Sequence, residues 1–515
     1  MQFVGYEWLA RQYGTPSVQP LPFRAAISTV RTQGQDGGGP LELFPAVMQP
    51  APTLQGHLTF ALKHEGVHLE ALARLFAAID PGELEEWFAS EPTGQYARRS
   101  CFLYEWLTGA ELRAQAAVGG NYVEAIDPER CLVNLRPANV PRWRVRDNLP
   151  GTREFCPTVR WTHRTRQVAQ YDCAKQIHKI ETEFGSEAMT GGSSQMALEE
   201  IAYSFALEGE GEATDRISAF AQWMQEHCGQ GAVPLRGQAL DGLQRRLLAG
   251  GAAVGLRNGQ AFVVQAERAG AIDYIAPGCA AIAGMLDGLA AFEEATTRQP
   301  SVLRAAALSF GFLFIRPLAE GNGRVSRYLI NDTLRRDGAV PGPLILPVSV
   351  KLSDGHMAPI NAEEAFRRYA GTLAKRFAAG CVPDPSSPSA LRFDGHDQAR
   401  ATWAYPDLTL QAEYLGQAVA ETVEQEVRRL VAVRREELRV RAAIQEIVVA
   451  PGDLIDRLVH ELLLEADVSR DLLKALPALD DVDVLAQVVE VLGESDLPGA
   501  EDLRRMTTPI ARPRG

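Results

Sequence analysis

Cysteine is scarce in this chain, and its placement argues against a secreted scaffold. The seven cysteines are scattered, odd in number and without a C-x-x-C pair. A small extracellular fold held by disulfides needs a denser, paired set. We therefore expect no disulfide framework and a reducing, cytoplasmic location.

Long apolar runs and an excess of positive charge are missing as well. The first residues, MQFVGYEWLARQYG, contain no apolar signal core, and no run is long enough to span a bilayer. The net charge is −13, from 52 basic and 65 acidic residues. That balance argues against a broad nucleic-acid-binding surface. We therefore expect neither a membrane nor a nucleic acid as the main partner.

The remaining composition is that of an ordinary globular protein. Of 515 residues, 46% are hydrophobic and 23% are charged, and no internal repeat is present. This length accommodates two to four domains.

The most informative stretch is 309–332, which reads SFGFLFIRPLAEGNGRVSRYLIND. A strongly apolar segment runs into a short loop, and a mixed polar and apolar segment follows from Arg324. Pro317 and the glycines at 321 and 323 should interrupt the helical period. The pattern predicts a helix, a tight loop and a second helix.

Charges around this loop predict an anion site. Consecutive amides at a helix start form a nest for an anion. Arg324 and Arg327 lie three apart in the first turn, where cations oppose the helix dipole, so a bound anion would explain them. Glu320 stands just before the nest and could hold a divalent metal that bridges phosphates. A plain Gly-Asn-Gly turn with solvated arginines is the alternative, and the loop alone does not separate the two.

The segment Glu320-Gly321-Asn322-Gly323-Arg324-x-x-Arg327 resembles the core of the Fic (Fido) signature, HxFx(D/E)GNGRxxR. The resemblance implies a mainly α fold and transfer of AMP from ATP onto a hydroxyl of a target protein. It implies the following roles: Gly321, Asn322 and Gly323 cradle the phosphates of ATP, Glu320 holds Mg2+, and Arg324 and Arg327 bind phosphate oxygens.

Two positions depart from the signature. The family's histidine falls on Arg316, and its phenylalanine falls on Leu318. That histidine is the general base, which needs a pKa near the working pH, whereas arginine stays protonated. Arg316 could still bind phosphate. We therefore expect a nucleotide site with weak or absent transferase activity, or a nucleotide-binding regulatory protein of the same fold.

A second motif lies upstream, on a helix predicted over 194–209. Glu208 sits in the last turn of this helix, where a carboxylate faces the negative end of the dipole, so a cationic partner is expected elsewhere. Ser204-x-x-x-Glu208-Gly209 resembles the inhibitory motif (S/T)xxxE(G/N) of many Fic proteins. The resemblance implies that Glu208 pairs with Arg327 and takes the place of the ATP γ-phosphate. The alternative is an acidic helix end, since Glu210 follows.

A β-hairpin is predicted within 255–277, with arms at Phe262–Val264 and Ala271–Ile275. In Fic proteins a flap at this place registers the target by strand addition. The implied partner is a target protein that presents a Ser, Thr or Tyr hydroxyl at the flap, and a homo-oligomer is compatible with the sequence.

A rival site is the literal H-E-x-x-H formed by His64, Glu65 and His68, on a helix predicted over Leu58–Ala78. Two histidines four apart on a helix can hold zinc while the glutamate activates water, as in a zinc hydrolase. Gly66 inside that helix argues against the hypothesis, because glycine destabilises a helix by about 1 kcal/mol relative to alanine. The longer metzincin pattern is absent, because Ala and Arg stand at 71 and 74. No third ligand is obvious in the sequence, although Glu83, Glu86 or Glu91 could be proposed.

We divide the chain into three predicted parts. Residues 1–190 form a mainly helical N-terminal domain of unknown role. Residues 191–382 form a Fic-type helical bundle with its flap. Residues 398–515 form a C-terminal helical module. A loop over 32–55 and a linker over 383–397 complete the scheme.

Overall fold

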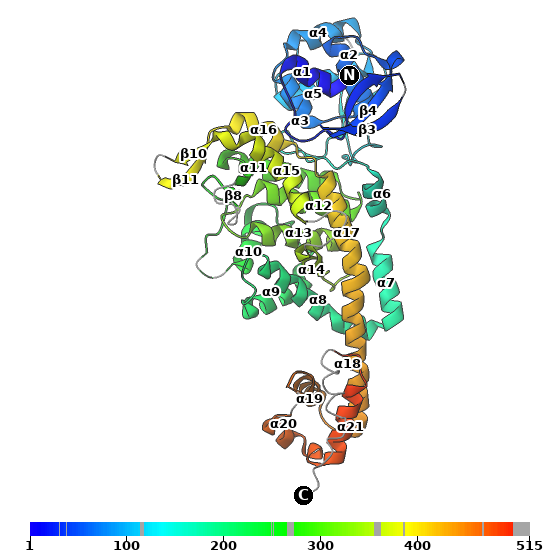
Figure 1. Cartoon of the computed structure of the whole chain (residues 1–515), viewed down its shortest axis with the longest axis vertical. Coiled ribbons are helices and arrows are strands. Elements are labelled where there is room, and N and C mark those ends of the chain that lie inside the picture. The colour runs from blue at the N-terminus through cyan, green and yellow to red at the C-terminus, as the bar shows by residue number, and fades with distance from the viewer. Residues whose placement is uncertain are drawn as a thin grey trace.

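The computed structural model describes residues 1–29, 31–37, 39–113, 118–248, 250, 252–264, 272–354, 362–384, 387–465 and 468–497. The protein is mainly helical, as predicted, with small sheets at its margins. Figure 1 shows an N-terminal part at one end, a central helical part, and a C-terminal part carried on a long helix. None of the described helices is both long and apolar enough to cross a membrane.

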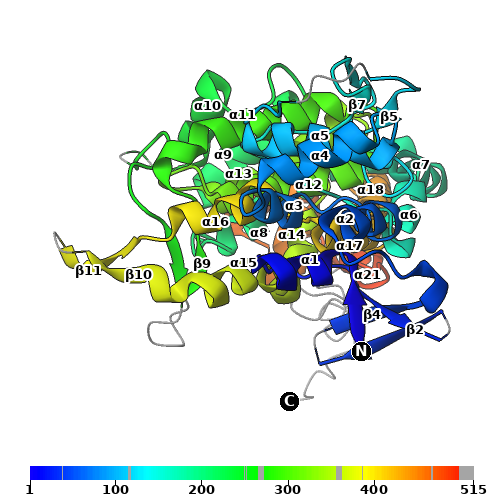
Figure 2. The same ribbon diagram turned by 90° about the horizontal axis from the view of Figure 1, so that it is seen from above.

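The N-terminal part combines five helices with a four-stranded sheet of order β1-β2-β4-β3. The predicted loop over 32–55 is wrong, because β3 and β4 pair within it and Phe44 packs in a small core with Val4 and Phe60. Figure 2 shows this sheet to one side of the helices. The elements are β1 (Gln2–Val4), α1 (Gly5–Tyr13), β2 (Arg24–Ser28), β3 (Thr32–Asp36), β4 (Gly39–Pro45), α2 (Leu54–Phe60), α3 (Leu69–Phe76), α4 (Pro81–Ser90) and α5 (Gln95–Thr108).

A second small sheet, of order β5-β7-β6, leads into the central part. Its strands are β5 (Val123–Glu124), β6 (Ala138–Val140) and β7 (Val145–Asp147). Trp143, between β6 and β7, is fully buried against Phe88, and its indole donates to Glu105 (2.6 Å). This tryptophan therefore anchors the segment to the N-terminal core.

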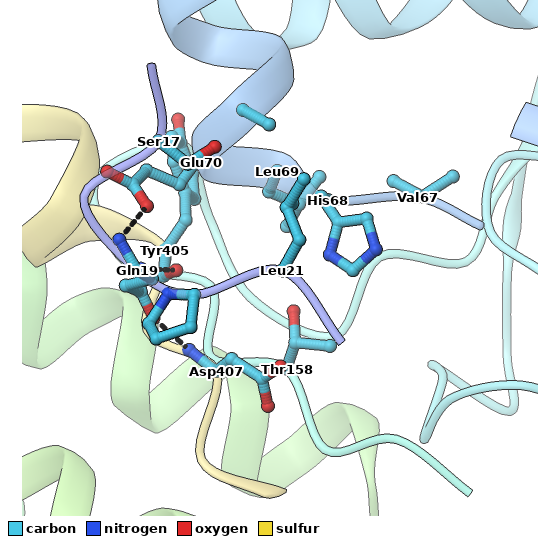
Figure 3. A pocket seen from close by; sticks show the side chains of 12 residues that line it. Ser17, Gln19, Leu21, Val67, His68, Leu69, Glu70, Thr158, Tyr405 and Asp407 are labelled. Carbon is cyan, nitrogen blue, oxygen red and sulfur yellow. Dashed lines mark hydrogen bonds between the residues drawn. The ribbon is translucent and has the colours of Figure 1, made fainter. Parts of the chain in front are cut away.

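The segment 17–21 connects the N-terminal and central parts through hydrogen bonds. Glu70 accepts hydrogen bonds from the amides of Val18 (3.0 Å) and Gln19 (2.9 Å). The Gln19 side chain donates to the carbonyl of Tyr405 (2.8 Å) and accepts from the amide of Asp407 (2.7 Å). Figure 3 shows the cavity beside this segment, which has a volume of about 30 Å³. That is space for about one water molecule, so this cavity cannot take a nucleotide.

The central part packs long helices around the buried α12 (Ser301–Ile315). The elements before α12 are α6 (His163–Gln170), α7 (Cys173–Phe184), α8 (Ser186–Ala206), α9 (Thr214–His227), α10 (Gly237–Leu247), β8 (Phe262–Val264), β9 (Ile272–Ile275) and α11 (Cys279–Ala295). Those after it are α13 (Asn322–Arg336), α14 (Val348–Ser353), α15 (Ala362–Phe377), α16 (His396–Ala404) and α17 (Thr409–Glu421). The predicted hairpin is present as β8 and β9, and its turn lies outside the described residues.

Two glycines expected to break the chain instead lie within a helix beside a later helix. The predicted start of a helix at residue 194 is wrong, because α8 runs without interruption from Ser186. A side-chain carbon at Gly191 would lie 2.6 Å from Arg434, and one at Gly192 would lie 3.8 Å from Val431. Glycine at 191 therefore leaves room for the Arg434 side chain of the later helix, whereas a side-chain carbon at 192 would make ordinary contacts. Local sequence does not reveal this neighbour.

The predicted linker over 383–397 is also wrong. β10 (Cys381–Asp384) and β11 (Ser387–Phe393) form an antiparallel hairpin that projects from one side in Figure 2. Phe393 is buried against Trp403, with ring centroids 5.8 Å apart. This aromatic contact anchors the base of a hairpin whose Pro and Ser content resembles that of a loop.

The C-terminal part is carried by α18 (Arg428–Ile447), which continues α17 through a π-helical turn. Its core begins at Val440, whereas α17 belongs to the central core, so the change of core does not coincide with residue 398. The remaining helices are α19 (Gly452–Glu465), α20 (Arg470–Ala475) and α21 (Val482–Gly493).

Candidate functional site

The stretch 309–332 forms the predicted helix, loop and helix. α12 ends at Ile315, and Arg316 turns the chain in the left-handed region (φ 47°, ψ 58°). α13 begins at Asn322 rather than at Arg324, after Gly321 at φ 86°. The Asn322 side chain closes the loop, because it accepts from the amide of Leu318 (2.9 Å) and donates to its carbonyl (2.8 Å). The Asn322 side chain therefore holds the loop through its oxygen and one N–H, and the Asn322 backbone amide begins α13.

Arg257 lies in the segment before the hairpin and binds this loop through hydrogen bonds. Its amide donates to the carbonyl of Pro317 (2.9 Å), and its Nε donates to the carbonyl of Arg316 (2.7 Å). The same guanidinium donates to the carbonyls of Gly259 (2.8 Å) and Pro277. Burial lowers the pKa of Arg257. One buried cation thus holds the loop and both ends of the hairpin together.

Glu208 lies just beyond the end of α8, in a turn completed by Gly209 at φ 77°. The predicted pairing is present: Arg327 Nη2 lies 3.0 Å from Glu208 Oε1. Arg327 also donates to the hydroxyl (2.8 Å) and the carbonyl (2.7 Å) of Ser204. Ser204 and Glu208 therefore bind one guanidinium together, with only 12% of the Arg327 side chain exposed. The helix predicted over 194–209 is wrong at its end, because it stops at Ala206.

The carboxylate of Glu208 also covers the start of α13. A Cβ built on Gly323 would lie 2.0 Å from Glu208 Oε1, so the carboxylate rests directly on this glycine. The first amides of a helix have no partner within the helix, and they carry the positive end of its dipole. The carboxylate of Glu208 therefore lies beside the predicted nest, against the first turn of α13, while its hydrogen-bond partner is Arg327.

Arg324 has a carboxylate partner that sequence reasoning missed. Glu210 Oε1 lies 2.9 Å from Arg324 Nη2, and Glu210 Oε2 lies 2.6 Å from Arg216 Nη2. Burial disfavours the charge on Glu210, but hydrogen bonds from Arg216 and from Arg324 outweigh it and lower the pKa of Glu210. In the sequence Glu210 looked like one more acid at a helix end. The only signal was an arginine six residues later, which is too weak to use.

Glu320 is exposed on the loop immediately before the nest. Its backbone carbonyl accepts from the Gln244 side chain (2.9 Å), which leaves the carboxylate facing solvent. Among the residues that the structure describes, no three His, Cys, Asp or Glu side chains gather as a metal site. One exposed carboxylate suits Mg2+, which usually keeps several waters and is held jointly by one or two carboxylates and substrate phosphates.

The zinc hypothesis for His64, Glu65 and His68 is wrong in its premise. A π-helical turn over Ala61–Glu65 ends at Gly66 (φ 95°), and His68 precedes α3 in an extended conformation. His64 packs against Phe60 and His68 against Tyr6, so the two rings face different neighbours. Glu65 accepts from the amide of Tyr6 (3.1 Å) under Gly5, where it supports the N-terminal core.

Glu65 should make the N-terminal part less stable at alkaline pH. Burial raises the pKa of Glu65 from 4.5 to about 8. Between these values the folded protein holds a proton that the unfolded chain has released, so stability falls as pH rises from about 5 to about 8. From pH 5 to pH 8, the ionisation of Glu65 should lower the free energy of unfolding by on the order of 3 kcal/mol. Glu65→Gln should remove this loss when denaturant unfolding is measured at both pH values. Glu86→Gln, an exposed control in the same part, should leave the slope unchanged, and an equal slope in the Glu65→Gln variant would contradict the assignment.

The comparisons with known proteins bear on the central part. Residues 234–334 match the model of the Fic/DOC family. This segment contains α10, the hairpin, α11, α12 and most of α13. No curated protein matches the chain. A crystal structure of a Fic family protein from Desulfovibrio desulfuricans G20 is similar at 16% identity and a TM-score of 0.34, over 52% of this chain and 75% of that chain. A TM-score of 0.34 is too low to support a conclusion. The similarity to the Fic/DOC family therefore rests on residues 234–334.

Proposed function

We propose that residues 191–382 form an autoinhibited Fic domain that binds ATP with Mg2+ at the start of α13. The observation that carries this proposal is the carboxylate of Glu208, which rests on Gly323 and pairs with Arg327. A helix start with a guanidinium group that already pairs with a carboxylate is also suited to a phosphate. The match of residues 234–334 to the Fic/DOC family supports the same assignment.

In this proposal the loop and α13 bind the phosphates once Glu208 has moved away. The amides at 321–323 face the α- and β-phosphates, and Arg324 and Arg327 bind their oxygens. Glu320 would hold Mg2+, which supplies positive charge to the phosphates when bound. The open edge of the β8–β9 hairpin would align a target peptide that carries a Ser, Thr or Tyr hydroxyl.

AMP transfer requires that the target hydroxyl oxygen attack the α-phosphorus. A bond forms between these two atoms, the bond from the α-phosphorus to the bridging oxygen breaks, and pyrophosphate leaves. The hydroxyl proton needs an acceptor, and Arg316 cannot serve because it is already protonated. We therefore propose that the protein as it stands binds nucleotide and transfers AMP weakly or not at all.

ATP binding by full-length variants tests this function. Glu208→Gly should strengthen binding of ATP with Mg2+ about tenfold or more in calorimetry, because it frees Arg327 and the nest. Glu212→Gly makes the same change four residues later on an exposed position, and it should leave affinity unchanged. Arg327→Ala added to Glu208→Gly should abolish the gain. Failure of the Glu208→Gly protein to bind ATP at millimolar concentration would refute the proposed function.

A further inference from the structure

Glu210 is held between two arginines, only one of which belongs to the Fic signature. Its two oxygens lie 2.9 Å from Arg324 and 2.6 Å from Arg216, which comes from the first turn of α9. Both guanidinium groups also lie over the ring of Phe205, at 5.1 and 5.4 Å from its centroid. The two cations therefore converge on one anion-sized position.

The donors of Arg324 are not all used in this arrangement. Its side chain is only 4% exposed, and its Nη1 donates to the carbonyl of Leu247 (3.1 Å). Its Nε is buried and has no hydrogen-bond partner among the described residues. Buried donors normally have partners, since an unpaired one costs about 1–3 kcal/mol. A two-oxygen carboxylate therefore leaves this position incompletely satisfied.

We propose that Arg216 and Arg324 form an anion subsite that Glu210 occupies now and that takes a phosphate group of the nucleotide after Glu210 leaves. This inference rests on the proposed function. A phosphate group offers more acceptor oxygens than a carboxylate, so it can bind both arginines and also reach the free Nε of Arg324. Arg216 then becomes a ligand of the nucleotide contributed from outside the signature.

The same contacts make Glu210 a second inhibitory carboxylate beside Glu208. Glu208 neutralises Arg327, and Glu210 neutralises Arg324, from the same short turn after α8. Removal of Glu208 alone leaves Arg324 paired and its subsite filled. Full access of the triphosphate to α13 therefore requires both carboxylates to leave.

Affinity for ATP with Mg2+, measured by calorimetry on full-length protein, tests the subsite. In the Glu208→Gly background, Glu210→Gln should strengthen binding about tenfold further. Glu212→Gln, which removes the same charge from an exposed neighbour, should have no effect. Arg216→Met added to Glu208→Gly and Glu210→Gln should weaken binding about tenfold, and Arg216→Lys should weaken it less.

The results separate this inference from the function on which it rests. If Glu208→Gly binds ATP but Glu210→Gln adds nothing, the subsite is refuted and the proposed function stands. If Glu210→Gln strengthens binding but Arg216→Met does not weaken it, Arg216 is not a ligand and the subsite is again refuted. If no variant binds ATP, both proposals fail.

Discussion

The Glu208→Gly, Arg316→His double variant should transfer label from α-labelled ATP about a hundred to ten thousand times faster than Glu208→Gly alone. Histidine would supply the acceptor for the hydroxyl proton, and the glycine would vacate the nest. Arg316→His alone should transfer little, because Glu208 still occupies the start of α13. The measurement is label incorporation into protein with Mg2+ for the unchanged chain, both single variants and the double variant.

The backbone at residue 316 is suited to this substitution. Its φ of 47° lies in the left-handed region, where histidine occurs more often than most side chains. Arg298 has a comparable conformation at φ 77° in the turn between α11 and α12. Arg298→His is therefore the matched control, and it should leave transfer unchanged. If the double variant binds ATP but transfers no label, the fold serves binding or regulation rather than transfer.

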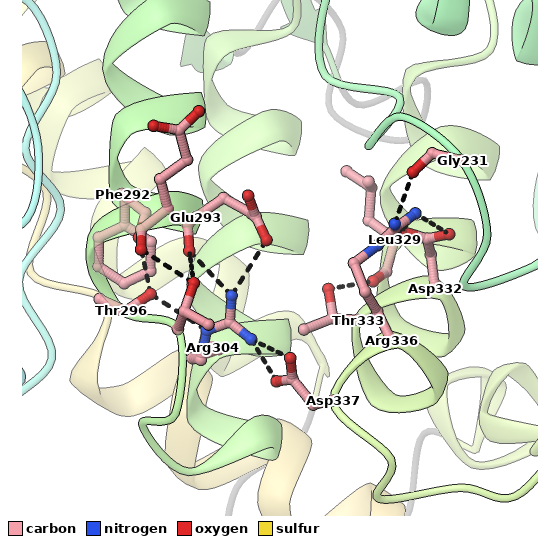
Figure 4. Close-up of polar contacts among 12 residues, drawn as sticks. Gly231, Phe292, Glu293, Thr296, Arg304, Leu329, Asp332, Thr333, Arg336 and Asp337 are labelled. Carbon is pink, nitrogen blue, oxygen red and sulfur yellow. Dashed lines mark hydrogen bonds and ion pairs between the residues drawn. The ribbon is translucent and has the colours of Figure 1, made fainter.

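Arg304→Met should destabilise the central part by about 3–5 kcal/mol. The Arg304 side chain is 1% exposed and bridges three helices, since it pairs with Asp337 and with Glu293 (3.1 Å) and donates to Thr296 (3.2 Å). Figure 4 shows these contacts between α11, α12 and the end of α13. Burial raises the pKa of Glu293 although Arg304 lowers it, so loss of the arginine leaves a carboxylate that is costly to ionise. Denaturant unfolding at pH 7 measures the effect.

A surface ion pair on α11, the helix that carries Glu293, provides the control for Arg304. Arg236 pairs with Asp287 of α11, but both side chains are more than half exposed, at 55% and 60%. Arg236→Met should cost about 1 kcal/mol or less, because water already solvates both charges. If Arg304→Met lowers the free energy of unfolding by no more than Arg236→Met does, the buried network contributes little.

The helices of the central part could be predicted because their apolar patterns are strong and local. The apolar segment predicted to form a helix before the loop is present as the end of α12, most of whose residues are buried. The loop and its Glu208 partner were predictable for another reason. The resemblance to the inhibitory motif of Fic proteins implied the pairing of Glu208 with Arg327. The unfavourable positions of Glu208 and of two arginines relative to the helix dipoles indicated only that each needs a partner of opposite charge.

The remaining features depend on contacts between residues far apart in sequence. Gly191 and Gly192 look like a break unless α18 is known to pass beside them. The helical turn ends at Gly66, and Glu65 beside it contacts Gly5, which is about sixty residues earlier in the sequence. Glu210 and Arg257 have ordinary sequence surroundings, and only the fold brings them to the loop. At β11 the Pro- and Ser-rich composition led to the wrong prediction of a linker. The strand is present there, and Phe393 at its end packs against Trp403.

The short turn after α8 makes Glu208 a tethered competitor for ATP in the proposed function. A group held two residues beyond a fixed helix is presented to the nest at an effective concentration of millimolar order or higher. ATP must therefore compete with the intrinsic affinity of the carboxylate multiplied by this local concentration. A longer or looser turn would weaken the inhibition without changing any contact, so the length of chain between Ala206 and Glu208 sets the nucleotide level at which the domain opens.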